Sequence, residues 1–207
     1  MEQTRTIWAP LQTPRIRLTP VEDEVRLAQA FALISLPDIK AGLEFPRVFS
    51  ALQFAGRLKA NPALTCFLLI PHGSEWPIGL VVYWGNAPAV GCGQILYAIH
   101  PDHRGQGFAL EATRALLNRL FQQGSIHGIG AFVAHGNAVS HHILMRLGMR
   151  AVGYGRTNMI FYYVGREGYR VEPLDRLTQS VDWSKSRSRL AQLAAMLYGL
   201  MITKMGM

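Results

Sequence analysis

The feature that most restricts the fold is a strand, a glycine-containing turn and a helix in direct succession. The apolar run QILYAI (Gln94–Ile99) is typical of a buried strand, and the turn HPDHRGQG follows it. Apolar residues then recur at helical spacing from Leu110 to Phe121, which predicts a helix that ends near Gly124. Such a turn can bind an anion, because the first N–H groups of a helix lack backbone partners, or it can simply start the helix.

The residues of the turn make an anion site possible. Gly105 and Gly107 carry no side chain that would keep a phosphate group away from the backbone, and Ala109 is also small. Arg104 adds a fixed positive charge beside them. Taken alone, two glycines before a helix are weak evidence for phosphate binding, because an ordinary turn has the same residues more often.

The remaining segments predict an α/β (α+β) protein in which helices pack on a mixed sheet. Two β-rich runs, Thr65–Ile70 and Ile78–Trp84, flank a turn and predict a hairpin. Further strands are expected at 15–19, 129–134, 150–154 and 158–164, and helices at 21–35, 46–60 and 137–149. The resulting order is β-α-α-β-β-β-α-β-α-β-β.

Length and charge limit the domain organisation and the partners. The 207 residues suit one domain, here residues 1–170, with a C-terminal helical extension over residues 171–207. A net charge of +8 favours an anionic partner, such as nucleic acid, a phosphorylated cofactor or an acidic membrane surface. Cys66 and Cys92 form neither a disulfide framework nor a metal-binding spacing, so we predict no metal site. Without a secretory leader or a membrane span, the expected compartment is the cytoplasm.

A second motif indicates a family. Arg104 to Ala109 fits [Q/R]xxGx[G/A], and NAVSHHILMRLGM (Asn137–Met149) fits NxxSxxxLxxxG followed by an apolar residue. In this order the two motifs resemble the GNAT superfamily of acyl-CoA-dependent N-acetyltransferases, and more narrowly its ribosomal-protein alanine N-acetyltransferase branch. The resemblance covers about Thr13 to Arg170, including TPRIRLTPVED, IGLVVYWG and FYYVGREGYR.

This resemblance implies acetyl-CoA (coenzyme A) as cofactor and a mostly antiparallel sheet whose central strands splay apart. The pyrophosphate would lie on the turn, and the pantetheine arm would add like a strand beside Tyr97–Ile99. Asn137 would hydrogen-bond the arm, and Ser140 would protonate the departing thiolate, although the two could instead cap and pack the helix. The cofactor-binding residues implied are Ile99, Arg104, Gly105, Gln106, Gly107, Phe108, Ala109 and Asn137.

The general base is the open question. Acetyl transfer needs a neutral amine, and many members of the family carry a glutamate where this chain has Gln94, which cannot accept a proton usefully. The base could lie elsewhere, a water could relay the proton, or the amine could arrive neutral. His135 and His141 are candidate substitutes, whereas His100 fits a structural role. Tyr97 could act as an acid, so the candidate catalytic residues are Ser140, Gln94 and Tyr97.

The expected function is therefore transfer of an acetyl group from acetyl-CoA to a primary amine, either a protein N-terminus or a small molecule, in a ternary complex. The alternative is a non-catalytic acyl-CoA-binding regulatory module, which Gln94 motivates. A third class is attachment to nucleic acid or a membrane through KSRSR (Lys185–Arg189) and the apolar helix after it. We favour docking of that helix on its own domain or in a homodimer, and expect no nucleic-acid partner.

Overall fold

The computed structural model describes residues 9–42, 50–61, 63–85, 92–124, 126–154 and 159–169. The helices are α1 (Glu24–Ser35), α2 (Pro37–Gly42), α3 (Ala51–Ala60), α4 (Phe108–Gln122) and α5 (Ala138–Arg146), with 3-10 turns at Pro101–His103 and Arg166–Gly168. The strands are β1 (Leu11–Gln12), β2 (Ile16–Pro20), β3 (Leu64–Pro71), β4 (Gly79–Gly85), β5 (Cys92–Ile99), β6 (Gly128–Ala134), β7 (Arg150–Tyr154) and β8 (Met159–Gly165).

The described strands form one eight-stranded sheet in the order β1-β2-β3-β4-β5-β6-β8-β7. Neighbouring strands are antiparallel except β5 and β6, which are parallel because α4 connects them. The hairpin predicted from the two β-rich runs is present as β3 and β4. The prediction of a mixed, mostly antiparallel sheet is confirmed.

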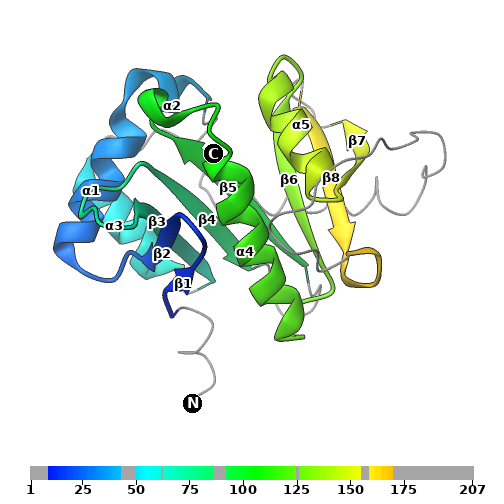
Figure 1. Ribbon diagram of the computed structural model, residues 1–207, viewed down its shortest axis with the longest axis horizontal. Helices are drawn as coiled ribbons and strands as arrows, with labels where there is room; N and C mark the ends of the chain where they lie inside the picture. Colours follow the sequence, from blue (N-terminus) through cyan, green and yellow to red (C-terminus); the bar gives the residue numbers. More distant parts are fainter. Residues whose placement is uncertain are drawn as a thin grey trace.

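The sheet opens between its two parallel strands. β5 pairs with β6 only at Cys92–Gln94, although β5 continues to Ile99 and β6 to Ala134. Beyond Gln94 the two strands diverge, so among the described residues neither strand has a pairing partner on the edge that faces the other (Figure 1). The splay therefore lies at the carboxyl ends of β5 and β6, where α4 and α5 begin.

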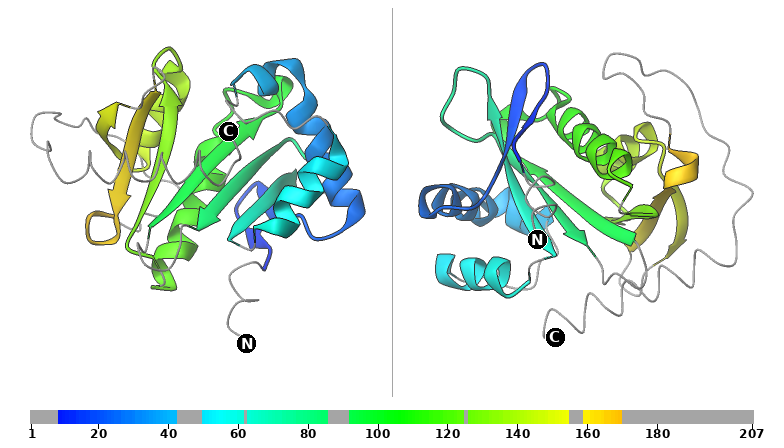
Figure 2. Two further views of the ribbon diagram at one scale, coloured as in Figure 1. Left: turned by 180° about the vertical axis from the view of Figure 1, so that it is seen from behind. Right: turned by 90° about the horizontal axis from the view of Figure 1, so that it is seen from below.

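Apolar side chains cover both faces of the sheet. α4 and α5 pack on one face over a buried cluster that includes Leu116, Leu117 and Leu144. α1, α2 and α3 pack on the opposite face over a second cluster that includes Ala30, Ile39 and Phe54. The view from below shows the sheet between the two helical layers (Figure 2). Alternate residues of β3 and β4 enter the two clusters, as a sheet buried on both faces requires.

One helix boundary differs from the predicted one, and two short elements are missing from the predicted order. The first helix begins at Glu24 rather than Val21, because the Asp23 side chain accepts a hydrogen bond from the Arg26 N–H (2.8 Å) and caps the helix. The predicted order omits β1, which two residues form by pairing with β2. It also omits α2, a six-residue helix that starts at Pro37.

Two predicted helical regions fall partly or wholly outside the described residues. The predicted helix at 46–60 corresponds to α3 from Ala51 onward, and residues 43–49 are not described. The predicted extension over residues 171–207 lies outside the described residues, and so does KSRSR.

Candidate functional site

The glycine turn presents a row of unused backbone donors. Gly105 and Gly107 have φ values of +74° and +83°, a region that glycine occupies without steric cost. In the part of the chain that the structure describes, no backbone N–H from Gly105 to Leu110 donates a hydrogen bond; the first N–H to do so is that of Glu111, to Gly107 O (3.0 Å). Helix α4 adds its positive dipole end here. This cradle can bind a phosphate or pyrophosphate group.

The splay lies directly beside this turn. Strand β5 ends at Ile99, whose carbonyl accepts a hydrogen bond from Arg104 Nε (3.2 Å). The unpaired edge of β5 from Ile95 to Ile99 can pair with an extended ligand, as an added strand would. An arm that runs along this edge and ends in a pyrophosphate on the turn fits the observed backbone, and coenzyme A has that chemical form.

Tyr97 reaches from β5 across the splay toward α5. Its hydroxyl donates a long hydrogen bond to the Ser140 carbonyl (3.4 Å), and its ring packs against the core under α4 and α5. Burial raises the pKa of Tyr97 to about 12, with a smaller upward effect from nearby Tyr162, while the hydrogen bond to Ser140 acts in the opposite direction. The phenol is therefore protonated near pH 7, so it can donate a hydrogen bond or a proton but cannot act as the base.

The beginning of α5 brings Asn137 and Ser140 to the same edge of the sheet. Asn137 Oδ1 accepts a hydrogen bond from the Ser140 N–H (3.1 Å), so the capping role weighed from the sequence is present. The cap uses only the amide oxygen, and the exposed amide nitrogen of Asn137 can still donate to a ligand. Ser140 is half-buried in the first helical turn.

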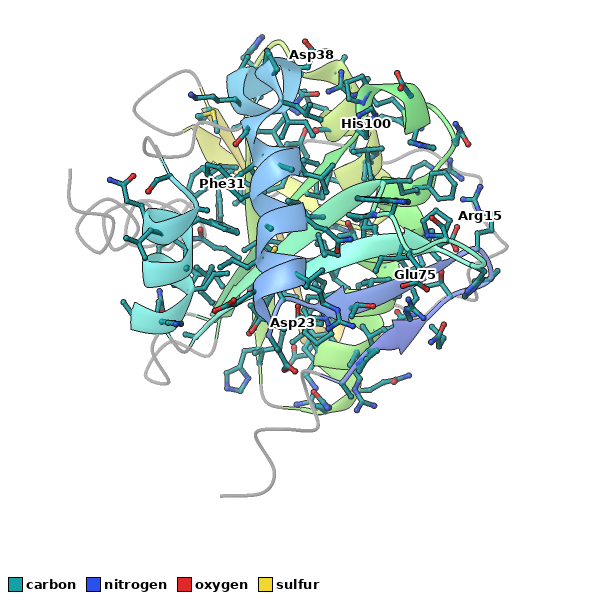
Figure 3. The ribbon with its side chains drawn as sticks, turned by 90° about the vertical axis from the view of Figure 1, so that its left-hand side faces the viewer. Arg15, Asp23, Phe31, Asp38, Glu75 and His100 are labelled. Atoms are coloured by element: carbon teal, nitrogen blue, oxygen red, sulfur yellow. The ribbon has the colours of Figure 1, made fainter. Side chains whose placement is uncertain are left out.

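The Arg104 side chain lies against α2, one of the helices that pack on the sheet face opposite to α4 and α5. Its Nη1 lies 3.7 Å from Asp38 Oδ2 of α2, and both side chains are largely exposed. Figure 3 shows Asp38 and His100 at the same end of the molecule, where β5 ends. Arg104 therefore connects α2 to the end of β5 in this conformation, which sequence reasoning did not anticipate.

Gln94 lies at the point where β5 and β6 separate. It is the last residue of β5 that pairs with β6, and it is 6% exposed. Because side chains alternate along a strand, Gln94 faces α1 and α3, opposite to Tyr97. Its buried Nε2 has no hydrogen-bond partner within the described residues, and neither does the indole Nε1 of Trp84, its neighbour across β4.

The histidines proposed as substitute bases occupy different environments. His141 Nε2 lies 3.1 Å from Ala134 O and 3.2 Å from His135 O, so this nitrogen carries the proton and donates. Its Nδ1 then accepts from the Tyr162 hydroxyl (2.9 Å). His141 thus connects α5 to β6 and β8. The lone pair on its unprotonated Nδ1 already accepts a hydrogen bond, so it is not available to take a proton from a substrate. His135 is exposed in the turn after β6, and His100 Nδ1 accepts from the Asp102 N–H (3.3 Å) in the 3-10 turn.

The structure adds one residue that sequence reasoning missed, Arg15. Its Nη1 donates to Gln106 O (2.9 Å), and its guanidinium carbon lies 4.5 Å from the centre of the Phe108 ring. Its Nε donates to Glu111 Oε2 (2.7 Å), and Nη2 forms an ion pair with the same oxygen (2.6 Å). Figure 3 shows Arg15 at the edge of the sheet beside β2. No local pattern marks this contact, because Arg15 and Gln106 are far apart in the sequence.

The family follows from a comparison with known protein families. The acetyltransferase (GNAT) domain family matches residues 15–150, which is more than half of the chain and includes both the glycine turn and α5. The chain belongs to the GNAT acetyltransferase family. No curated protein sequence is significantly similar to this GNAT protein.

Solved structures agree with this GNAT fold. One is a GNAT-family acetyltransferase from Bacillus anthracis, with 20% identity, a TM-score of 0.65 and coverage of 76% of this chain and 99% of that one. A spermidine N-acetyltransferase from Vibrio cholerae, solved with CoA and spermine, has 20% identity and a TM-score of 0.67 with the same coverage. A ribosomal-protein-S5-alanine acetyltransferase from Vibrio fischeri has 18% identity, a TM-score of 0.64 and coverage of 78% and 99%.

Three predictions are confirmed at this level: the GNAT fold, the class of acetyl-CoA-dependent N-acetyltransferase, and acetyl-CoA as cofactor. The roles of individual residues stay predictions. Among the described residues, no helix has the length and apolar character needed to cross a bilayer.

Proposed function

We propose that this GNAT protein transfers an acetyl group from acetyl-CoA directly to a primary amine, in a ternary complex at the splay. The observation that carries the proposal is the row of unused N–H groups from Gly105 to Leu110 beside the open edge of β5. When bound, acetyl-CoA supplies the activated thioester. The turn holds its pyrophosphate, and the β5 edge and the Asn137 amide nitrogen orient its arm.

The chain's own groups near the splay favour proton donation over proton removal. Tyr97 is a neutral phenol at pH 7, and Ser140 carries a hydroxyl in the first turn of α5. Either group can protonate a departing thiolate. Gln94 cannot remove a proton from an ammonium group, and the Nδ1 lone pair of His141 already accepts a hydrogen bond from the Tyr162 hydroxyl. These residues therefore do not supply a base for the amine substrate. Transfer can still proceed if the amine arrives neutral or if a water molecule takes its proton.

The cofactor site is tested with Gly107→Glu. This variant places a carboxylate where the phosphate groups would lie, so we expect calorimetry to detect no binding of coenzyme A. Gly148→Glu is the matched control, because Gly148 has φ +78°, open space around it and a position at the far end of α5. Equal affinity in the two variants would overturn the proposed site.

The acceptor is proposed as an amine of low positive charge, such as a protein N-terminus, because a chain with a net charge of +8 repels polycations. The resemblance to the ribosomal-protein alanine N-acetyltransferases makes a peptide with N-terminal alanine the first acceptor to test, with spermine as the polycationic comparison. We expect faster release of CoA with the peptide than with spermine, and the reverse order would contradict this acceptor class.

A non-catalytic acyl-CoA-binding module is the second candidate, and the observation that favours it is the amide at position 94. A broad panel of amines distinguishes the two functions. Tight binding of acetyl-CoA together with no release of CoA for any amine supports the module, whereas release with even one amine supports the enzyme.

For the chain after the catalytic domain, we propose that residues 171–207 form a helical extension that docks on its own domain or on a second copy of the chain. Removing the residues after Asp182 tests this proposal. A homodimer that dissociates on truncation, measured by sedimentation, supports dimer docking. Binding of the full chain to anionic vesicles or to nucleic acid would support the alternative.

A further inference from the structure

The peptide unit between Gln106 and Gly107 can adopt two orientations. A flip of a peptide unit changes ψ of the first residue and φ of the second, and glycine tolerates φ of either sign. Gly107 is the second residue here, with φ +83°, and among the described residues only Arg15 Nη2, at 3.5 Å, lies near the position of an added Cβ. Glycine at this position therefore leaves both signs of φ sterically accessible.

The two orientations have opposite effects on an anion. In a trans peptide unit the carbonyl and the N–H point in opposite directions. The Gln106 carbonyl points toward the Arg15 guanidinium, so the Gly107 N–H points away from that guanidinium. After a flip, the carbonyl oxygen would take the place of that N–H and would repel a phosphate group. The orientation of this one unit therefore strengthens or weakens the attraction that the turn, with its other N–H groups, exerts on a pyrophosphate.

Arg15 holds the carbonyl end of this unit. Its Nη1 donates to Gln106 O (2.9 Å), while the Nε side of the same planar group is held by Glu111 (2.7 Å). The Glu111 carboxylate also accepts from the Arg15 N–H (3.0 Å) and from Thr13 Oγ1 (2.6 Å), and it is almost completely buried. A planar guanidinium can hydrogen-bond the Gln106 carbonyl and the Glu111 carboxylate at the same time with fixed geometry, whereas a lysine ammonium cannot.

Arg15 also compensates a charge that would oppose anion binding. Glu111 lies in the first turn of α4, next to the row of unused N–H groups. An uncompensated carboxylate at this position would repel a phosphate. The ion pair with Arg15 Nη2 (2.6 Å) offsets this charge.

We propose that Arg15 is a positioning residue for coenzyme A, which orients the Gln106–Gly107 peptide unit so that the Gly107 N–H faces the pyrophosphate. The inference rests on the proposed function, since it requires the glycine turn to be the pyrophosphate site. Arg15 would thus affect cofactor binding by orienting the backbone of the turn.

The first test compares Arg15→Lys with Arg17→Lys, a control that makes the same change two residues further along the chain, within β2. We expect coenzyme A to bind Arg15→Lys more weakly by roughly tenfold, the equivalent of one lost hydrogen bond to a charged group. Arg17→Lys should keep the affinity of the unaltered protein. Equal affinities of both variants and the unaltered chain would overturn the inference.

The second test separates orientation from charge. The double variant Arg15→Ala/Glu111→Gln removes both members of the ion pair and leaves no uncompensated carboxylate. If Arg15 acts by orienting the peptide unit, the double variant still binds coenzyme A weakly. Recovery of full affinity would show that only the charge of Glu111 matters, and would overturn the positioning role.

A spectroscopic measurement separates positioning from loss of fold. In ¹H–¹⁵N spectra, coenzyme A should shift the Gly107 amide of the unaltered chain strongly, and that of Arg15→Lys weakly. The amide of Gly148, far from the turn, should be unchanged in both proteins. A Gly107 shift of equal size in both proteins would contradict the inference. Failure of the unaltered chain to bind coenzyme A would instead contradict the proposed function, so the two failures are distinguishable.

Discussion

Trp84 and Gln94 face each other across β4 and β5, and each ends in a buried N–H donor without a hydrogen-bond partner among the described residues. Residues in register on neighbouring strands project from the same face of a sheet, so the two side chains are neighbours. A carboxylate at position 94 could accept from the indole, whereas the amide nitrogen cannot.

Gln94→Glu therefore tests whether the missing base limits catalysis. We expect the rate of CoA release with an accepted amine to rise by about 100-fold at pH 7, the lower end of the effect of a positioned base. The rate should be recorded from pH 6 to pH 9, where a new ascending limb would report the carboxylate. An unchanged rate and an unchanged pH profile would show that position 94 is not where the proton is removed.

Gln94→Met tests the cost of the buried amide. Methionine has a similar shape and no donor, so we expect the free energy of unfolding to increase by about 1 kcal/mol. Denaturant unfolding measures this change. Gln122→Met at the exposed end of α4 is the control and should alter stability by less than about 0.5 kcal/mol. A destabilised Gln94→Met protein would show that the amide has a partner that stabilises the fold.

The contact between His141 and Tyr162 predicts coupled effects on stability. Tyr162→Phe leaves His141 Nδ1 without its donor, and His141→Ala leaves a hydroxyl of a residue that is 3% exposed without its acceptor. We expect each variant to lose about 1–3 kcal/mol of stability, with a double-mutant coupling of at least about 0.5 kcal/mol. A strictly additive double variant would disprove the contact. Loss of activity without loss of stability in His141→Ala would instead support a catalytic role.

The buried tyrosines predict a fall in stability at alkaline pH. Burial raises the pKa values of Tyr83 and Tyr97 to about 12, so the native state keeps protons that the unfolded state, with tyrosine pKa values near 10, releases. Their stabilising effect is complete below pH 10 and decreases as the pH rises from 10 to 12. Unfolding experiments across this range should show the decrease, and Tyr97→Phe should reduce its slope. An unchanged slope in that variant would contradict the raised pKa of Tyr97.

Both cysteines should react slowly with thiol reagents in the folded protein. Cys66 and Cys92 are buried, and burial raises the pKa of the Cys66 thiol to about 12 and that of the Cys92 thiol above its usual value. We expect no rapid colour change with a disulfide reagent at pH 8 until denaturant is added. Rapid reaction of the native protein would show that one thiol is accessible. A slow background would allow released CoA to be followed directly with the same reagent.

Local patterns predicted the parts of the site that depend on neighbouring residues. The glycine turn, the start of α5 and the β3–β4 hairpin each follow from a short stretch of sequence, and all three are present. The cap formed by Asn137 was also visible, because a cap and its N–H partner are three residues apart.

The contacts that the sequence did not reveal join distant segments. Arg15 and Glu111 are 96 residues apart, and His141 and Tyr162 are 21 apart, so no periodicity or motif connects them. Helix α2 was missed because six residues are too few for a periodic pattern, although Pro37 and Asp38 are typical of a helix start. β1 consists of two residues and is defined only by its pairing with β2.

The brief pairing of β5 with β6 has a consequence for the protein without its cofactor. A strand in the middle of a sheet is usually among the segments best protected from hydrogen exchange. Beyond Gln94, however, one side of β5 has no partner strand within the part of the chain that the structure describes. An interior strand with a free edge is also a template for pairing with another chain. If coenzyme A occupies this edge, as proposed, we expect it to slow amide exchange in β5 and to suppress aggregation, so that it would act as a folding ligand as well as a reactant.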